Sequence, residues 1–396
     1  MHIWFAVVLS VATLLTLYLG WRLIEPSSMG RKQKIVAWLI VGGLLFGQRL
    51  TRFLHSEGIE GVLFNSMNWV GYVFLGFVSI VTVLMLVRDI PLCIRAIMSG
   101  LNKLFVKRSK RPYFIEPDLE RRRFLLNASN AVILAVSLPL AGYSMFQARS
   151  KPLTVHNTLP IPDLPEGLDG FTIAQISDTH IGPTLRGDWM RMVVDEVNAL
   201  GADMIVHTGD LVDGSVADLN GAIRPIADLK APHGTWMCTG NHEYYSGVKQ
   251  WLKEAQRLKM HPLVNEHTLI DTGKGTILLA GVSDYRSSRL EPSHVSSPAD
   301  AIKNAPDHDV SILLAHQPRS VFDASRVGFD VQLSGHTHGG QYFPWTLAIH
   351  LFQPYVRGLH LHDNTLIYVN VGTGYWGPPF RLGTSPEITL HTLKRS

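Results

Sequence analysis

Cysteine and charge are both scarce in this sequence. Only two of its 396 residues are cysteines, Cys93 and Cys238, so a disulfide-rich scaffold is excluded. Charged residues make up 17% of the chain, whereas a soluble domain usually has ~25%. A phosphate-binding loop ending in Gly-Lys-Ser/Thr is also missing, which argues against nucleotide use through a P-loop. The shortage of charge indicates long hydrophobic segments.

Charge and histidine are unevenly divided between two parts of the chain. Residues 1–150 have a net charge of +10, and residues 151–396 have a net charge of −6. Nucleic-acid binding needs a basic surface, so no nucleic-acid partner is expected for the acidic second part. All but two of the 18 histidines lie beyond residue 150, so metal or acid–base chemistry is expected there.

Three apolar runs lie near the start of the chain, at about residues 3–24, 35–46 and 62–87. A membrane-spanning helix needs ~20 mostly apolar residues, so the first and third runs qualify. The second run is short, and it is either a span or an interfacial or buried helix. Residues 1–123 are therefore expected to form an N-terminal transmembrane region of about three spans.

The basic segment at 88–123, expected as a loop, orients these spans. It carries ten Lys and Arg residues against four acidic residues, and cytoplasmic loops collect Lys and Arg. With this loop inside, a fourth apolar run at 124–148 crosses outward. The prediction is a multi-pass protein of the inner (cytoplasmic) membrane, with its C-terminal part on the extracytoplasmic side and membrane lipid as a partner.

The fourth run begins with an unusual basic motif, within "ERRRFLLNASNAVILAVSLPLAGYSMFQA" at residues 120–148. Arg121 and Arg122, followed by Phe124, resemble the twin-arginine export signal of bacteria, which carries folded and often cofactor-loaded proteins. Segment 124–148 is then either an uncleaved twin-arginine-like signal anchor or an ordinary fourth span with a basic flank. A Pro-rich linker is expected at 149–165, followed by a folded domain at 166–396.

Metal-binding residue types recur after five apolar runs of this domain, each expected to be a buried strand. Since ligands of α/β proteins bind at the carboxyl ends of strands, five such ends can converge on one point. The donors are carboxylate, amide and imidazole groups without thiolate, which suits Zn, Mn or Fe. One block alone is typical of a turn, but five in order predict a metal site. The blocks are "DTH" with Asp178 and His180, "GDLVD" with Asp210 and Asp213, "GNHE" with Asn241 and His242, "AHQP" with His316, and "GHTHGGQ" with His336 and His338.

These blocks resemble the calcineurin-like metallophosphoesterase superfamily. The closing "GTGYWGPPFRLGTSPEITLHTL" is similar to its membrane-associated bacterial phosphodiesterase branch, which is related to the hydrolases of UDP-2,3-diacylglucosamine. The resemblance covers about residues 165–396. It implies an α/β fold, a four-layer α/β/β/α sandwich of two mixed sheets, which here follows an all-α transmembrane region. It also implies two divalent metal ions (Mn, Zn, Fe or Co) at the strand ends.

The resemblance assigns a role to each residue of the blocks. Asp210 is expected to bridge the two metals. His242 is expected to be catalytic, as the proton donor to the leaving oxygen, and Asp213 is expected to orient it. One metal is expected to be held by Asp178, His180, Asp210 and His338. The other is expected to be held by Asp210, Asn241, His316 and His336.

The function implied is that of a membrane-anchored dinuclear-metal phosphoesterase. It would hydrolyse a phosphodiester or pyrophosphate bond of a lipid-linked or nucleotide-like substrate by attack of a metal-bound hydroxide. Two alternatives stay open: a phosphoprotein or other phosphomonoester phosphatase, and a membrane regulatory or receptor module that uses the domain without catalysis.

An apolar segment, "YFPWTLAIHLFQPYVRG" at Tyr342–Gly358, follows the last block. It is either core beneath a long loop or a hydrophobic lip that faces the bilayer, because aromatic residues favour the membrane interface. Arg357 in this segment and Arg381 in the closing one are candidates for contact with a phosphate.

Overall fold

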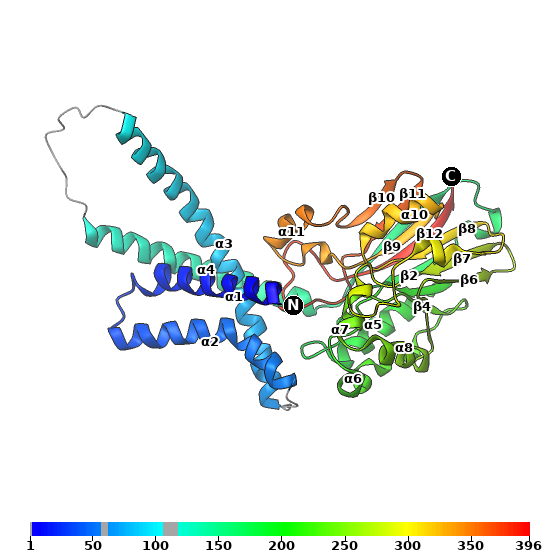
Figure 1. Ribbon diagram of the computed structural model, residues 1–396, viewed down its shortest axis with the longest axis horizontal. Helices are drawn as coiled ribbons and strands as arrows, with labels where there is room; N and C mark the ends of the chain where they lie inside the picture. Colours follow the sequence, from blue (N-terminus) through cyan, green and yellow to red (C-terminus); the bar gives the residue numbers. More distant parts are fainter. Residues whose placement is uncertain (1, 57–61, 106–117) are drawn as a thin grey trace. The chain divides into compact units, whose positions relative to one another are not determined.

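The computed structural model describes residues 2–56, 62–105 and 118–396, which divide into two compact units between Tyr143 and Ser144 (Figure 1). In the described part of the first unit, every regular element is a helix. Its elements are α1 (His2–Leu19), the π-helical η1 (Gly20–Ile24), α2 (Arg31–Ser56), α3 (Val62–Phe105) and α4 (Leu119–Arg149), the last of which runs on into the second unit.

Two of the described helices are long and apolar enough to cross a membrane, at Ser66–Asn102 and Leu119–Arg149. A shorter apolar helix covers Leu9–Ile24. The second apolar run lies within α2, which does not meet the same test. The helical unit therefore has the elements of a membrane region.

The expected loop at 88–123 is partly helical instead, because α3 continues to Phe105. Ile94, Ile97 and Leu101 carry the apolar pattern onward at helical spacing, which extends the helix beyond the hydrophobic run. Residues 106–117 of this loop lie outside the described residues.

Polar side chains join three helices of the first unit. Arg22 donates through Nε to Asp89 at 2.6 Å, and Tyr18 donates to the same carboxylate at 2.8 Å. Arg88 reaches Asn130 of α4 at 2.7 Å, and Asn130 in turn donates to the Arg22 carbonyl at 2.7 Å. Buried charges need such partners, so this network fixes the continuous α1–η1 segment, α3 and α4 against one another.

The second unit contains two six-stranded sheets. Both are mixed: β12 is antiparallel to β2 in the first sheet, and β10–β11 and β6–β7 are antiparallel pairs in the second. The first has the order β1 (Leu153–Ile161), β12 (Glu387–Arg395), β2 (Thr172–Ile176), β3 (Met204–His207), β4 (Thr235–Met237), β5 (Met260–Pro262). The second has the order β10 (Gly358–His362), β11 (Thr365–Val369), β9 (Val331–Ser334), β8 (Val310–Leu314), β7 (Thr276–Gly281), β6 (Glu266–Asp271).

Alternating side chains build the layers of this unit. On β3, Met204 and Val206 pack into the core between the two sheets, whereas Ile205 packs towards the helices of the first sheet. On β8, Ile312 joins the inter-sheet core, whereas Leu313 packs with the helices of the second sheet. The helices that cover the first sheet are α5 (Gly187–Ala199), α6 (Val216–Ile223) and α8 (Val248–Arg257), and those on the second are α9 (Pro298–Ile302) and α10 (Val321–Val327).

This arrangement confirms the expected α/β/β/α sandwich. Both sheets are buried on two faces, which explains why their strands read as continuous apolar runs in the sequence. Two short helices, α7 (Asn241–Tyr245) and α11 (Trp345–Ala348), lie in loops beyond the strand ends.

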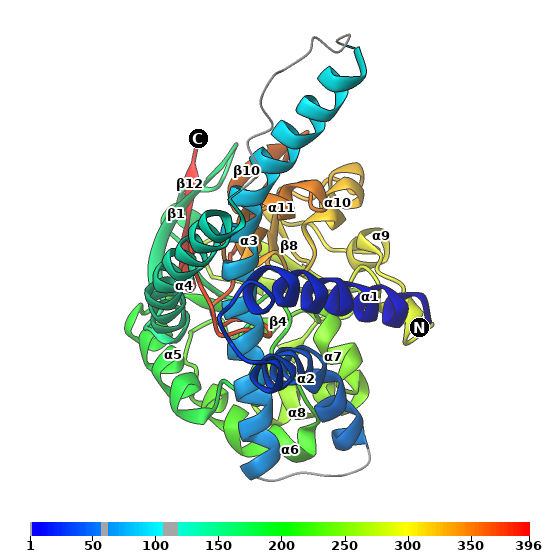
Figure 2. The same cartoon turned by 90° about the vertical axis from the view of Figure 1, so that its left-hand side faces the viewer.

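The expected linker at 149–165 is corrected by the structure, because most of it is strand β1. β1 runs parallel to β12 at the edge of the first sheet, as Figure 2 shows. Leu159 and Ile161 are buried on either side of the exposed Pro160. The proline misled the sequence analysis, since an edge strand tolerates a residue that cannot donate to the ladder.

The burial of β1 predicts a stability effect. Leu159→Ala should lower the free energy of unfolding of the second unit by about 2–5 kcal/mol, the usual cost of emptying a core position. Leu153→Ala, on the exposed end of the same strand, should cost less than about 0.5 kcal/mol. Urea-dependent pulse proteolysis of the full chain in detergent measures both, and equal midpoints would contradict a core role for β1.

Candidate metal centre

Loops after five strands meet at one point of the second unit. Three of these strands, β2, β3 and β4, belong to the first sheet, and two, β8 and β9, belong to the second. Each strand stops just before a polar block. The side chains of these blocks are largely buried, so they need polar partners within the protein. The convergence that the sequence predicted is therefore supplied by both sheets.

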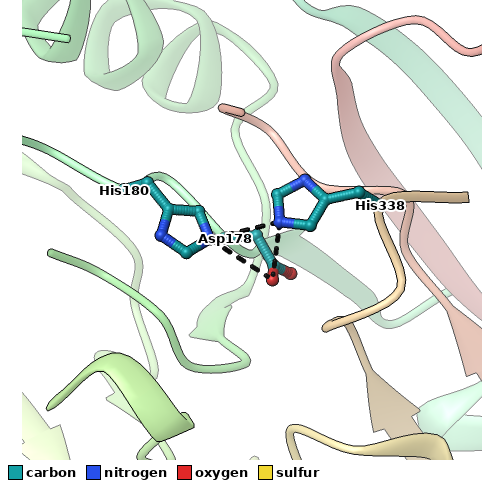
Figure 3. A group of neighbouring side chains, drawn as sticks. All are labelled: Asp178, His180 and His338. Atoms are coloured by element: carbon teal, nitrogen blue, oxygen red, sulfur yellow. Dashed lines mark hydrogen bonds and ion pairs between the residues drawn. The ribbon is translucent and has the colours of Figure 1, made fainter. Parts of the chain in front are cut away.

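The first cluster consists of Asp178, His180 and His338 (Figure 3). The Nε2 atoms of the two histidines lie 3.1 Å apart, and they lie 3.9 Å (His180) and 3.4 Å (His338) from Oδ1 of Asp178. All three side chains are buried, and their donor atoms face a common point. Imidazole nitrogens and a carboxylate oxygen in this arrangement fit a divalent cation.

The second cluster consists of Asp210, His316 and His336. Nε2 of His316 lies 3.1 Å from Oδ2 of Asp210 and 3.1 Å from Nδ1 of His336. The same Oδ2 atom lies 3.7 Å from Nε2 of His180, so Asp210 stands between the two clusters. The side-chain oxygen of Asn241 is shielded from solvent and has no hydrogen-bond partner among the described residues, as expected of an atom that needs a cation.

Burial keeps two of these imidazoles neutral. It lowers the pKa of His336 to about 3, and the charge of His316 acts in the same direction. Burial also holds the pKa of His338 well below its usual range, with a further contribution from His180. Neutral imidazole is the form that binds metals, so the shifts of His336 and His338 agree with their place among the metal donors.

Polar contacts outside the clusters orient two of the histidine rings. Nδ1 of His316 lies 2.8 Å from the carbonyl of Thr208, and Nδ1 of His180 lies 3.3 Å from Oδ1 of Asp213. These contacts place the Nε2 atom of each ring towards the clusters. Asp213 also pairs with Nδ1 of His242, so it supports two histidines and not only the one that the sequence predicted. Burial alone would raise the pKa of Asp213, but His180 and His242 outweigh it and hold that pKa well below the usual range.

His242 lies beside the clusters, close to exposed aromatic side chains. Its ring centroid is 4.7 Å from that of His180, 5.2 Å from Tyr245 and 5.8 Å from Trp376, and the last two are largely exposed. Burial disfavours its charged form, but the carboxylates of Asp210 and Asp213 outweigh this and raise the pKa of His242 to about 9. A protonated imidazole beside the clusters can donate a proton to a bound ligand.

The backbone at the ligands is strained. Asp178, His180, Asp210, His336 and His338 all have left-handed φ angles, between 45° and 71°. Each such residue costs of order 1–3 kcal/mol, and strain of this kind concentrates at functional sites. Residue types alone gave no sign of this conformation.

Two residues of the site were missed or misread in the sequence. Glu243 is buried, and its carboxylate accepts the N–H groups of Gly240, Asp210 and Leu211 at 2.6, 3.0 and 2.7 Å. Its place in the "GNHE" block was the available signal. Arg381 does not face a phosphate, because it is fully buried and donates to backbone carbonyls that include that of His338 at 3.2 Å.

Known proteins resemble this chain. A family model described as Calcineurin-like phosphoesterase matches residues 171–340. The Bos taurus "Transmembrane protein with metallophosphoesterase domain" is 32% identical over 389 residues, 90% of this chain and 87% of that protein. The Danio rerio protein of the same name is 35% identical over 271 residues, 66% of this chain but only 62% of that relative. An "Uncharacterized metallophosphoesterase" of Helicobacter pylori is 35% identical over 269 residues, 67% of this chain and 70% of that protein.

The tight approach of glycine to the first cluster gives a prediction. A Cβ atom at Gly335 would lie 2.0 Å from Oγ of Ser177 and 2.2 Å from Oδ2 of Asp178. Gly335→Ala should therefore displace Asp178 and weaken metal binding by about 10–100-fold, the range for loss of support to a ligand. Metal titration of the demetallated protein measures it.

Gly221→Ala is the matched control, since nothing lies within 4 Å of a Cβ atom at that position of α6. Equal metal affinity in the two variants would show that the close contact at Gly335 does not position Asp178.

Proposed function

The chain belongs to the calcineurin-like metallophosphoesterase family and is a metal-dependent phosphoester hydrolase, and we propose that it acts as a membrane-anchored phosphodiesterase or pyrophosphatase. Its substrate is a lipid-linked or nucleotide-like phosphoester. The observation that carries this proposal is the pair of histidine–carboxylate clusters with Asp210 standing between them, and His242 beside them next to the exposed ring of Trp376.

Two divalent ions, chosen from Mn, Zn, Fe and Co, fit the two clusters. One would be held by the first cluster together with Asp210, and the other by the second cluster together with Asn241. When bound, such a pair supplies Lewis-acid polarisation of phosphoryl oxygens and lowers the pKa of water.

The protein's own contribution is to place a proton donor and hold it. Nδ1 of His242 is engaged by Asp213, which leaves Nε2 as the donor atom, and the backbone N–H of His242 donates to Oδ1 of Asp210 at 2.8 Å. As the ester bond breaks, the departing oxygen takes the Nε2 proton. The raised pKa of His242 keeps that proton available at neutral pH.

The proposed membrane anchoring rests on the apolar helices α3 and α4. Their orientation is inferred from the distribution of Lys and Arg in the sequence. The basic segment 88–123, which includes the end of α3, stays in the cytoplasm. α4 then crosses outward, and the catalytic unit works on the extracytoplasmic side of the inner membrane.

Comparing two soluble esters tests the proposed reaction. The metal-loaded full chain should hydrolyse bis-p-nitrophenyl phosphate faster than p-nitrophenyl phosphate. The reverse preference would make it a phosphomonoesterase, and no turnover of either would favour a non-catalytic module. A panel of lipid and nucleotide phosphoesters, assayed with each of the four metals, then separates the two substrate classes.

The roles of Asp210 and His242 predict different consequences of substitution. Asp210→Asn should lower both metal content and activity, because its carboxylate faces both clusters. His242→Asn should keep the metals and lower kcat by about 10²–10⁴-fold, the usual contribution of a positioned proton donor. Elemental analysis and steady-state kinetics measure the two effects.

His360→Asn, on the exposed part of β10, is the control for removing a histidine and should change neither quantity. Loss of metal from His242→Asn would assign this residue to the ligands and remove it as the proton donor.

The basic start of α4 predicts an export phenotype. Arg121→Lys combined with Arg122→Lys should leave the earlier helices in the membrane and strand the catalytic unit inside, because Lys keeps the charge but not a twin-arginine motif. Protease protection of intact spheroplasts reports the location. Arg123→Lys is the control, because it keeps Arg121 and Arg122 and should be exported. If the double variant is exported as well, the export interpretation is wrong and these arginines are only the basic flank of a helix.

A further inference from the structure

A patch of large apolar side chains stands exposed on the catalytic unit. This patch, which we call the shelf, consists of α11, the 3₁₀ turn η7 (Ile349–Leu351) and their neighbours. The exposed fractions of its large side chains lie between 39% and 82%, so they do not form core. Clustered exposed apolar residues mark a site of contact with a partner or a membrane. The shelf residues are Phe343, Trp345, Leu347, Leu351 and Phe352.

The shelf is firmly attached at both ends. Tyr342 before it and Val356 after it are buried, and the Val356 carbonyl accepts the hydroxyl of Thr337 at 2.6 Å. Between Gln341 and Arg357 there is no Asp, Glu, Lys or Arg, and His350 is the one side chain that can become charged near neutral pH. The exposure of the shelf is therefore a property of a fixed, nearly uncharged segment.

The last turns of α4 belong to the same compact unit as the shelf. Ala148 is fully buried in the core of this unit, and Gln147 donates to Ser385 at 2.8 Å. The carbonyl of Ser144 accepts the backbone N–H of Arg381 at 2.9 Å. The end of the proposed membrane helix is thus held by residues 381–385.

The same loop holds the start of the shelf. The N–H of Phe343 donates to the Leu382 carbonyl at 3.0 Å, and Tyr342 forms a parallel bridge with Leu382. Arg381 and Leu382 are consecutive residues. Arg381 is therefore bonded to the end of α4, and Leu382 is bonded to the start of the shelf. The bilayer that α4 leaves must therefore lie within reach of the shelf.

We propose that the shelf inserts into the interfacial region of the membrane leaflet from which α4 emerges. Exposed Phe146 continues the apolar surface of α4 to its last turn. Tryptophan and phenylalanine on a short uncharged segment suit the boundary between headgroups and acyl chains, into which apolar faces sink by about 5–10 Å. The inference rests on the membrane anchoring proposed above.

This contact would fix the distance of Trp376 and His242 from the membrane surface. The side chain of Gln341, directly before the shelf segment, accepts the N–H of Trp376 at 2.9 Å and donates to its carbonyl at 3.0 Å. The ring of Trp376 lies beside His242. An inserted shelf would hold Trp376 and His242 at the level of lipid headgroups, which favours a substrate whose phosphoester sits on a membrane-embedded lipid.

Site-specific fluorescence of the full chain in proteoliposomes tests the contact. Leu351→Cys, in a Cys93→Ser background, carries an NBD label, while Cys238 is buried and stays unlabelled. In vesicles of phosphatidylethanolamine and phosphatidylglycerol, its emission should shift to the blue. Lipids with a nitroxide high on the acyl chain should quench most of it. Leu269→Cys is the control, because it lies on β6 at the edge of the second sheet opposite β10.

Two outcomes would overturn the proposal. Iodide could quench the label at position 351 as strongly as that at position 269, which means that the shelf faces water. Alternatively, the label could be shielded from iodide but not quenched by lipid nitroxide, which means that protein covers the shelf.

Separate measurements keep the underlying proposals distinguishable. Release of the chain by alkaline extraction would refute anchoring by α4, whatever the label shows. Leu351→Asp with Phe352→Asp should abolish lipid quenching of a label placed at Leu347→Cys but leave turnover of bis-p-nitrophenyl phosphate unchanged. If the unsubstituted chain does not hydrolyse bis-p-nitrophenyl phosphate, the proposed reaction is refuted, but the membrane contact of the shelf is not.

Discussion

The arrangement of the site depends on one buried carboxylate, that of Asp210. One of its oxygens lies near both His316 and His180, and the other accepts the backbone N–H of His242. A carboxylate removed from water is costly unless positive charge or donors surround it. Loops of both sheets supply those partners, and Glu243 supports the same turn from behind by accepting the N–H of Asp210. The packing of the two sheets against each other therefore also creates the site that can bind cations.

The parts of the structure that were predictable have local causes. Continuous apolar runs indicate strands buried on two faces, and a polar block after each run indicates where the strand ends. Asp178, Asp210 and His316 could therefore be placed at strand ends from the sequence. Their meeting at one point needed a fold, which the resemblance to a known family supplied and the two sheets confirm.

The parts that were not predictable depend on which loops meet in space. Asp213 lies 33 positions after His180, and nothing local says that the two side chains touch. Arg381 looked like a ligand for phosphate, yet its guanidinium joins backbone carbonyls inside the unit. β1 was hidden by its proline, since an edge position excuses a residue that would break an inner strand. Left-handed backbone at the ligands is likewise imposed by the surrounding contacts.

The pairing of β1 with β12 has a consequence for biosynthesis. β12 is the last strand of the chain, and it lies between β1 and β2, the first two strands of the unit. Until residues 387–395 have left the ribosome, β1 has no neighbour and the first sheet has an open edge. Contacts of such long sequence separation also form slowly. The membrane helix α4 is thus made early and β12 after every other described strand, so the catalytic unit can be completed only once residues 387–395 have been made.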